Sequence, residues 1–262
     1  MSTDKTRKTK VTILGTGTSS GVPTIGCNCK TCTSDDPKDK RLRVSALIQR
    51  GDTNIVIDSS ADFRQQMLKN NVKSLDAVVY THHHYDHISG FDDIRAYNFT
   101  SQKTMPIYLN KKTFDILSHT FSYAFGKAEQ IGGGVPLIDV NIINHEKFEI
   151  SGIEFEAIPM MHGKLEVYGF RIGDFAYCTD TNFIPEESFE KLKDLKYLVL
   201  DALRFDPHPT HFNLEQAMKA AQRIGAEQTY FTHIAHAFKH DEVDSSLPER
   251  MNLGYDGLIM EF

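Results

Sequence analysis

The chain has 262 residues, a formal net charge of −6 at pH 7 and 40% hydrophobic residues. That hydrophobic content supports a sizeable core and excludes a disordered chain. The acidic balance excludes a broad basic surface, which disfavours extended DNA or RNA as a partner. No run approaches the roughly 18 apolar residues that span a membrane.

The N-terminal segment, residues 1–10, is polar and basic and lacks the apolar run of a secretory signal. We expect it to be a disordered tail on a cytoplasmic protein. No internal repeat, low-complexity tract or linker interrupts the rest of the chain. We therefore predict one domain over residues 11–262.

The first half of the chain contains short strands and helices. We predict strands at Val11–Leu14, Arg43–Gln49, Asn54–Asp58, Asp76–Thr81 and Pro106–Leu109, and helices at Ala61–Asn70 and Phe91–Tyr97. Arg50-Gly51-Asp52 is a turn signal, so the second and third strands are expected to form a hairpin.

The second half of the chain also contains both strands and helices. We predict strands at Lys147–Ile158, Glu166–Ile172, Phe175–Cys178, Tyr197–Leu200 and Gln228–Phe231, and helices at Ile184–Leu195 and Asn213–Ile224. Strands are about as frequent as helices and come in adjacent groups. This pattern favours two stacked sheets with helices outside over a doubly wound parallel sheet.

The stretch Phe121–Pro136 has two interpretations. It carries Phe121, Tyr123 and Phe125, followed by three glycines at 132–134. It is either a mobile aromatic loop over a functional site or a set of core aromatics followed by a turn.

The strongest signal is the segment Thr81–His87, which directly follows a buried-type strand. His82 and His84 are two residues apart, so in an extended or tight-turn segment they point the same way. Asp86 and His87 follow at once and can serve a neighbouring metal. Imidazole and carboxylate ligands suit Zn²⁺, Mn²⁺ or Fe at a hydrolytic centre. The alternative, a surface histidine run, fits poorly behind a core strand.

Two metals need more ligands than this segment supplies. Three further residues of metal-binding type each follow an apolar strand: His162, Asp180 and His233. A rigid strand end can aim each of them, although each taken singly is equally compatible with a structural role.

Three cysteines, Cys27, Cys29 and Cys32, crowd into six residues. In a reducing compartment this spacing suits a metal better than a disulfide framework. A closed Zn²⁺ site needs four ligands. Cys178 is a poor fourth, because it lies inside a predicted strand and is expected to be a buried structural thiol. The alternative is three reduced surface cysteines, which would be prone to oxidation.

The motif His82-x-His84-x-Asp86-His87 resembles the hallmark of the metallo-β-lactamase superfamily. The resemblance implies a four-layer αββα sandwich. It implies one metal held by His82, His84 and His162, a second held by Asp86, His87 and His233, and a bridging Asp180. Asp58 matches the superfamily's aspartate before the motif, and we expect it to orient a ligand rather than bind metal.

The resemblance also points to one branch of this superfamily. Four segments resemble the PhnP-like branch, which is typified by a cyclic phosphodiesterase of phosphonate breakdown. They are Gly15-Thr16-Gly17, the cysteine segment, Thr232-His233-Ile234-Ala235-His236 and Tyr255-Asp256-Gly257. The similarity extends from about Val11 to the C-terminus. It implies that His236 is the fourth ligand of a structural zinc.

The resemblance also assigns catalytic roles. His211 matches the branch's catalytic histidine, and we expect it to donate a proton to the leaving group or to orient the phosphate. Asp86 is expected to bind metal and to accept a proton from the attacking hydroxide. His208 and Lys164 are candidate substrate contacts. A helix-flanking surface histidine is the alternative for His211.

The sequence therefore predicts a phosphoric diester hydrolase with two active-site metals (Zn, Mn or Fe) and one structural zinc. Its expected substrate is a small cyclic phosphate of ribose or nucleotide type, attacked by a hydroxide that bridges the two metals. Thioester or lactone hydrolysis and ribonuclease Z-like tRNA 3′ processing are the alternatives, and a non-catalytic metal-binding protein ranks last. A homodimer would be ordinary for the family.

Overall fold

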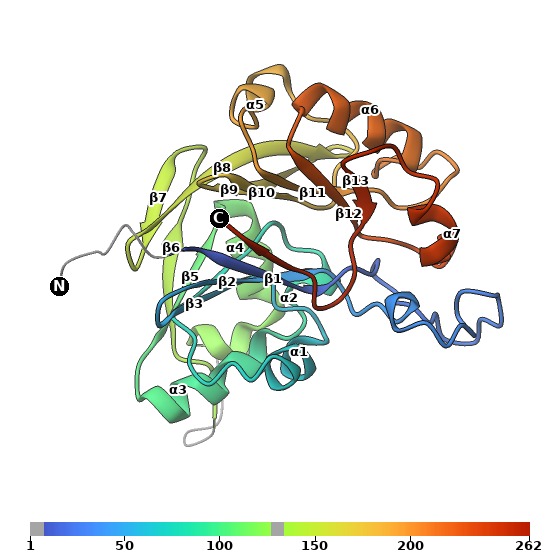
Figure 1. The fold of residues 1–262 in the computed structure, drawn as a ribbon. Helices are drawn as coiled ribbons and strands as arrows, with labels where there is room; N and C mark the ends of the chain where they lie inside the picture. The colour runs from blue at the N-terminus through green and yellow to red at the C-terminus, as the bar shows by residue number, and fades with distance from the viewer. Residues whose placement is uncertain (1–7, 127–133) are drawn as a thin grey trace.

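The computed structural model describes residues 8–126 and 134–262. These residues form two seven-stranded β-sheets stacked face to face, with helices on both outer faces (Figure 1). The order of layers is helix, sheet, sheet, helix. The predicted αββα sandwich is therefore confirmed.

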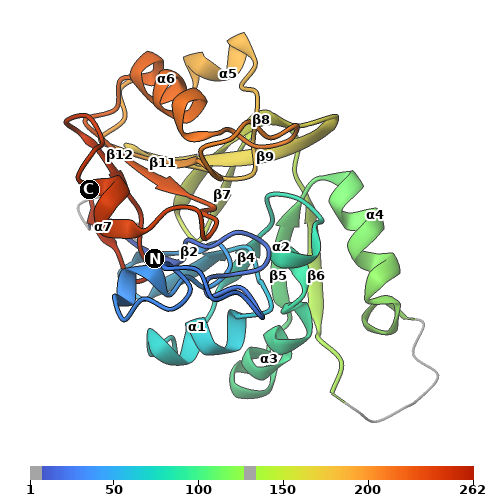
Figure 2. The same ribbon diagram turned by 90° about the vertical axis from the view of Figure 1, so that its right-hand side faces the viewer.

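The first sheet comes mostly from the first half of the chain. In spatial order its strands are β14 (Ile259–Glu261), β1 (Lys10–Gly15), β2 (Ser45–Arg50), β3 (Thr53–Ile57), β4 (Ala77–Val79), β5 (Met105–Leu109) and β6 (Ile138–Ile142). Strands β3 to β6 run parallel, so their carboxyl ends share one edge. Helices α1 (Phe63–Lys69), α3 (Arg95–Ser101) and α4 (Lys111–Thr120) cover its outer face (Figure 2).

The second sheet comes from the second half. In spatial order its strands are β13 (Met251–Leu253), β12 (Gln228–Thr232), β11 (Tyr197–Asp201), β10 (Phe175–Cys178), β9 (Leu165–Ile172), β8 (Ile153–His162) and β7 (Lys147–Ile150). Strands β10, β11 and β12 are parallel, and β8 points the same way because β9 is antiparallel to both β8 and β10.

Helices α5 (Glu186–Glu190), α6 (Leu214–Ile224) and α7 (His240–Asp244) pack on the second sheet's outer side. Helix α6 begins where predicted because Asn213 and Gln216 form a capping box. It ends at Gly225, whose φ of 73° suits glycine. The remaining helical pieces are short: α2 (Tyr85–Ile88), and 3₁₀ turns at Pro37–Asp39, Phe91–Ile94 and Ser122–Phe125.

The main core lies between the sheets. Phe155 and Phe170 are fully buried there and meet edge to face, with ring centroids 6.4 Å apart. Ile13 and Ile55 of the first sheet belong to the same cluster. Apolar burial across this interface holds the two halves of the chain together, which positions the strand ends described below.

Several predicted elements differ from the structure. The strand predicted at Lys147–Ile158 is two strands, because Ser151 and Gly152 adopt positive φ and turn the chain. The helix predicted at Ile184–Leu195 is only the five-residue α5. The helix predicted at Phe91–Tyr97 is a 3₁₀ turn followed by α3, which extends to Ser101.

The predicted tail, residues 1–10, is too long at its inner end. Residues 1–7 lie outside the described residues, but Lys10 begins β1. The amide of Thr9 already donates to the carbonyl of Phe262 (2.8 Å). The pairing of β1 with β14 therefore makes Thr9 part of the folded domain.

The aromatic stretch is only partly described, since residues 127–133 lie outside the described ranges. Phe121 and Phe125 pack on the buried Phe91, with ring centroids at 4.9 and 5.8 Å. These two side chains are core aromatics. Among the described helices, none is long and apolar enough to cross a membrane.

The inter-sheet core generates a stability prediction. Phe155→Ala should lower the free energy of unfolding by about 3–5 kcal/mol, because it leaves a cavity between the sheets. Urea denaturation monitored by circular dichroism would measure this. Phe99 is 58% exposed, so Phe99→Ala is the matched control and should change stability by only about 0.5 kcal/mol. Equal losses in both variants would contradict this account of the core.

Candidate metal centre

Polar residues gather where the strands of both sheets end. They lie at or just past the carboxyl ends of β3, β4, β8, β10, β11 and β12, and they are Asp58, His82, His162, Asp180, Asp201 and His233. The stacking of the sheets brings these ends to one edge of the sandwich. The turn after β4 and helix α2 add His84, Asp86 and His87.

One group joins His82, His84, His162 and Asp180, whose ligand atoms all lie within 4.8 Å of one another. Nδ1 of His162 is 2.6 Å from the carbonyl oxygen of Thr210. A carbonyl can only accept, so Nδ1 carries the proton and Nε2 is free to bind a cation. Nε2 of His82 is buried, 3.9 Å from Oδ2 of Asp180, and forms no hydrogen bond within the described residues.

A second group joins Asp86, His87, Asp180 and His233, with the same close spacing. Nε2 of His87 is 3.3 Å from Oδ1 of Asp180, and Nε2 of His233 is 3.3 Å from Oδ2. Both nitrogens are buried without a hydrogen bond to any described residue. Asp180 belongs to both groups, so its two oxygens can bridge two ions.

Both groups fit divalent cations. Buried imidazole nitrogens without partners are costly unless something satisfies them, and mixed imidazole and carboxylate donors suit Zn²⁺, Mn²⁺ or Fe. Within the described part of the chain, the fold brings together all seven residues that the sequence predicts as active-site ligands.

Asp58 orients one ligand. Its Oδ2 accepts from Nδ1 of His87 at 2.7 Å, and its Oδ1 accepts from the amide of Thr81 at 2.8 Å. With its proton on Nδ1, His87 directs Nε2 toward Asp180. Asp58 therefore contacts the Nδ1 side of His87, in the ligand-orienting position that the sequence predicts.

Charges in the site stabilise one another. Burial would lower the pKa of His233, but the carboxylates of Asp180, Asp201 and Asp86 outweigh it and raise that pKa to about 9. Burial would raise the pKa of Asp180, yet His233 and His87 hold it well below its ordinary value. Asp180 is therefore ionised, the state in which a carboxylate binds metal. Burial lowers the pKa of His82 and favours its neutral, ligating form.

Three of these residues adopt left-handed backbone conformations. Asp58, Asp180 and His233 have φ values of 62°, 52° and 58°. Each follows the end of a strand, and the left-handed residue turns the chain sharply there. For residues other than glycine this conformation costs free energy and persists only where surrounding contacts hold it.

His211 stands beside both ligand groups. Its ring centroid lies 4.5 Å from those of His162 and His233. Its Nδ1 donates to Oδ2 of Asp201 at 2.9 Å, which leaves Nε2 for the site. Asp201 was not among the predicted site residues. The available signal was its position directly after the apolar strand Tyr197–Leu200, whereas Asp58 is identified by the family resemblance.

The two predicted substrate contacts lie at the rim. His208 is partly buried, 5.2 Å from His211 between ring centroids, and its Nδ1 is 3.2 Å from the hydroxyl of Thr210. Lys164 is exposed in the turn between β8 and β9, two residues after His162.

A separate cluster contains Cys27, Cys29, Cys32 and His236. The three sulfurs lie 3.2, 3.5 and 3.5 Å from Nδ1 of His236. Neighbouring sulfur and nitrogen ligands of one tetrahedral zinc are about 3.5 Å apart. These residues can therefore hold a closed zinc site. Cys178 is buried in the outer core of the second sheet instead, and burial raises the pKa of its thiol to about 12.

The two stacked sheets with histidine and aspartate ligands at one edge define the metallo-β-lactamase fold. Residues 53–234 match the family model of the beta-lactamase superfamily domain, and the chain belongs to that superfamily. Within it, a crystal structure described as "a New Diphosphatase from the PhnP Family" is 43% identical, covers 97% of both chains and superposes with a TM-score of 0.92. The chain therefore belongs to the PhnP family.

Two further relatives are more distant or larger. An octanoyltransferase of Porphyromonas gingivalis is 37% identical over 250 residues, which is 94% of this chain but only 50% of that protein. The chain thus spans about half the length of that relative. Human tRNase Z, short form, shares the fold with a TM-score of 0.69 at 16% identity, over 96% of this chain and 98% of that chain.

Proposed function

We propose that the protein hydrolyses a small phosphorus diester with the help of two divalent cations. The observation that carries this proposal is the pair of ligand groups sharing Asp180, with His211 beside both. Bound there, two cations would acidify a water molecule and offset the charge that gathers on the phosphate oxygens. The predicted substrate is a cyclic phosphate of ribose or nucleotide type.

A diphosphate is the second candidate substrate. A diester of diphosphate and a cyclic phosphate both present a phosphorus atom with one leaving oxygen, so the same residues serve both. The diphosphatase that is 43% identical favours this candidate.

His211 would protonate the leaving oxygen. Asp201 holds Nδ1–H of His211 at 2.9 Å, which aims Nε2 at the space beside His162 and His233. The carboxylate also stabilises the cationic ring. Asp86 would bind metal and accept the proton of the attacking water. Lys164 and His208, at the rim, would contact the phosphate or the group attached to it.

His211→Ala should lower kcat by about 10²–10⁴-fold, the usual contribution of a general acid. Metal content should not change, because His211 is in neither ligand group. Steady-state kinetics and metal analysis measure the two effects. His119 is exposed on α4, so His119→Ala is the control and should leave kcat unchanged. A loss smaller than about threefold would remove His211 from this role.

A substrate panel tests the reaction class. The protein loaded with Mn²⁺ or Zn²⁺ should hydrolyse bis(p-nitrophenyl) phosphate and either a 2′,3′-cyclic nucleotide or a dinucleoside diphosphate. The contrasting substrates are a glutathione thioester, a lactone and a precursor tRNA. Hydrolysis of one of these alone would replace the proposal with the corresponding alternative, and no turnover of any substrate would favour a metal-binding role.

We also propose that the cysteine cluster holds a structural zinc. Cys29→Ser should remove about one zinc ion per chain and lower Tm while kcat stays near the wild-type value. Zinc analysis and differential scanning calorimetry measure this. Cys178→Ala is the control, since it should lower Tm through lost packing yet keep the zinc. Unchanged zinc content and Tm in Cys29→Ser would refute the structural zinc.

A further inference from the structure

Two motifs have no part in the proposed chemistry: Gly15-Thr16-Gly17 and Tyr255-Asp256-Gly257. The structure joins them. Oδ1 of Asp256 accepts from the amide and the hydroxyl of Thr16, at 2.9 and 2.8 Å. Oδ2 accepts from the amide of Leu42 at 2.7 Å. Both carboxylate oxygens are thus used to hold the backbone of two separate segments.

The backbone on either side of Thr16 packs tightly against the backbone of residues 41–43. A Cβ atom on Gly15 would lie 2.0 Å from the carbonyl oxygen of Arg43, and one on Gly17 would lie 2.8 Å from that of Arg41. Glycine is required at both positions because the neighbouring atoms are backbone and cannot give way. Thr16 itself is fully buried. It therefore has little freedom to move independently of Asp256.

The other side of Thr16 meets the segment that carries His233. The carbonyl oxygen of Thr16 accepts from the amide of Ile234 at 2.8 Å, and the amide of Thr18 donates to the carbonyl of Ile234 at 3.2 Å. Ile234 directly follows His233, whose φ is 58°. These hydrogen bonds are among the contacts that hold His233 in its left-handed conformation, with Nε2 3.3 Å from Asp180.

We propose that Asp256 is a positioning residue for the second ligand group and acts on His233 through Thr16 and Ile234. The proposal rests on the proposed function only in treating His233 as a metal ligand. A residue that stabilises the fold alone would affect unfolding and leave metal affinity unchanged. A positioning residue would affect metal affinity, because outer partners of metal ligands typically contribute about 10–100-fold.

Asp256→Asn is the informative variant. The amide nitrogen would face the backbone N–H of either Thr16 or Leu42, so in either orientation the side chain keeps its shape but can no longer hold both segments together. Mn²⁺ is the probe, because it favours carboxylate and imidazole over thiolate ligands and so reports on this site rather than on the cysteine cluster. Titration of the metal-free protein followed by electron paramagnetic resonance should show one of the two bound Mn²⁺ ions weakened about 10–100-fold.

Two further variants separate positioning from folding. Thr16→Val removes only the hydroxyl donor and should weaken Mn²⁺ less than Asp256→Asn, and Thr16→Ser should restore wild-type affinity. Asp174 is exposed and its side chain makes no hydrogen bond or ion pair with the described residues, so Asp174→Asn is the matched control.

Unchanged Mn²⁺ affinity in Asp256→Asn, with or without a lower Tm, would overturn the inference. If wild type binds two Mn²⁺ ions but hydrolyses no phosphorus ester, the proposed function fails while this inference stands.

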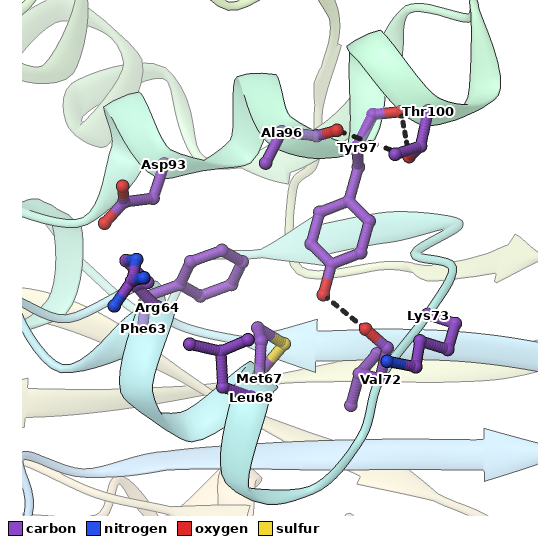
Figure 3. A pocket seen from close by; sticks show the side chains of 10 residues that line it. All are labelled: Phe63, Arg64, Met67, Leu68, Val72, Lys73, Asp93, Ala96, Tyr97 and Thr100. Atoms are coloured by element: carbon purple, nitrogen blue, oxygen red, sulfur yellow. Dashed lines mark hydrogen bonds between the residues drawn. The ribbon is translucent and has the colours of Figure 1, made fainter.

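A second feature carries no proposal. The cavity between α1 and α3 has a volume of about 320 Å³ and is lined by Phe63, Met67 and Tyr97 among others (Figure 3). The hydroxyl of Tyr97 donates to the carbonyl of Val72 across it. Nothing in the structure indicates what would fill it.

Discussion

The centre depends on one shared carboxylate. Asp180 belongs to both ligand groups: its Oδ1 lies 3.3 Å from Nε2 of His87, and its Oδ2 lies 3.3 Å from Nε2 of His233 and 3.9 Å from Nε2 of His82. Burying an ionised carboxylate is costly unless positive charge surrounds it. Without metal, His87 and His233 provide that charge, because the surrounding carboxylates raise their pKa values; bound cations would provide it in their place. Asp201 lies close behind: its Oδ2 accepts from the amide of Thr181 and from His211. One pair of neighbouring strand ends thus fixes both the bridge and the proposed proton donor.

Much of this could be predicted because the signals are local. His82, His84, Asp86 and His87 occupy six consecutive positions after an apolar strand, and the spacing alone indicates ligands. His162, Asp180 and His233 lie far from that segment in the sequence. Only the strand pattern, together with the family resemblance, assigns them to the same site. The layer order could also be predicted, because the strands are about as frequent as the helices and come in adjacent groups, and each amphipathic element must bury one face.

The rest depends on tertiary contacts that a sequence pattern does not reveal. The helix predicted at Ile184–Leu195 is short because apolar residues such as Leu192 and Leu195 fill the outer core from a turn rather than a helix. Asp201 directly follows an apolar strand in the sequence, but its role is evident only from its hydrogen bond with His211 at 2.9 Å. Thr16 and Asp256 are separated by 240 positions, so their hydrogen bond is visible only in the folded chain.

The division of ligands between the two halves has a mechanical consequence. Four ligands come from the first half of the chain and three from the second, and the sheets that carry them are held together by apolar packing. Bound cations would therefore act as reversible cross-links between the sheets. Because the seven ligands converge only in the folded chain, cation binding would favour the folded state over the unfolded one. Thermal resistance and metal supply should then rise and fall together, so that a metal-starved cell would hold less of the folded protein as well as less active protein.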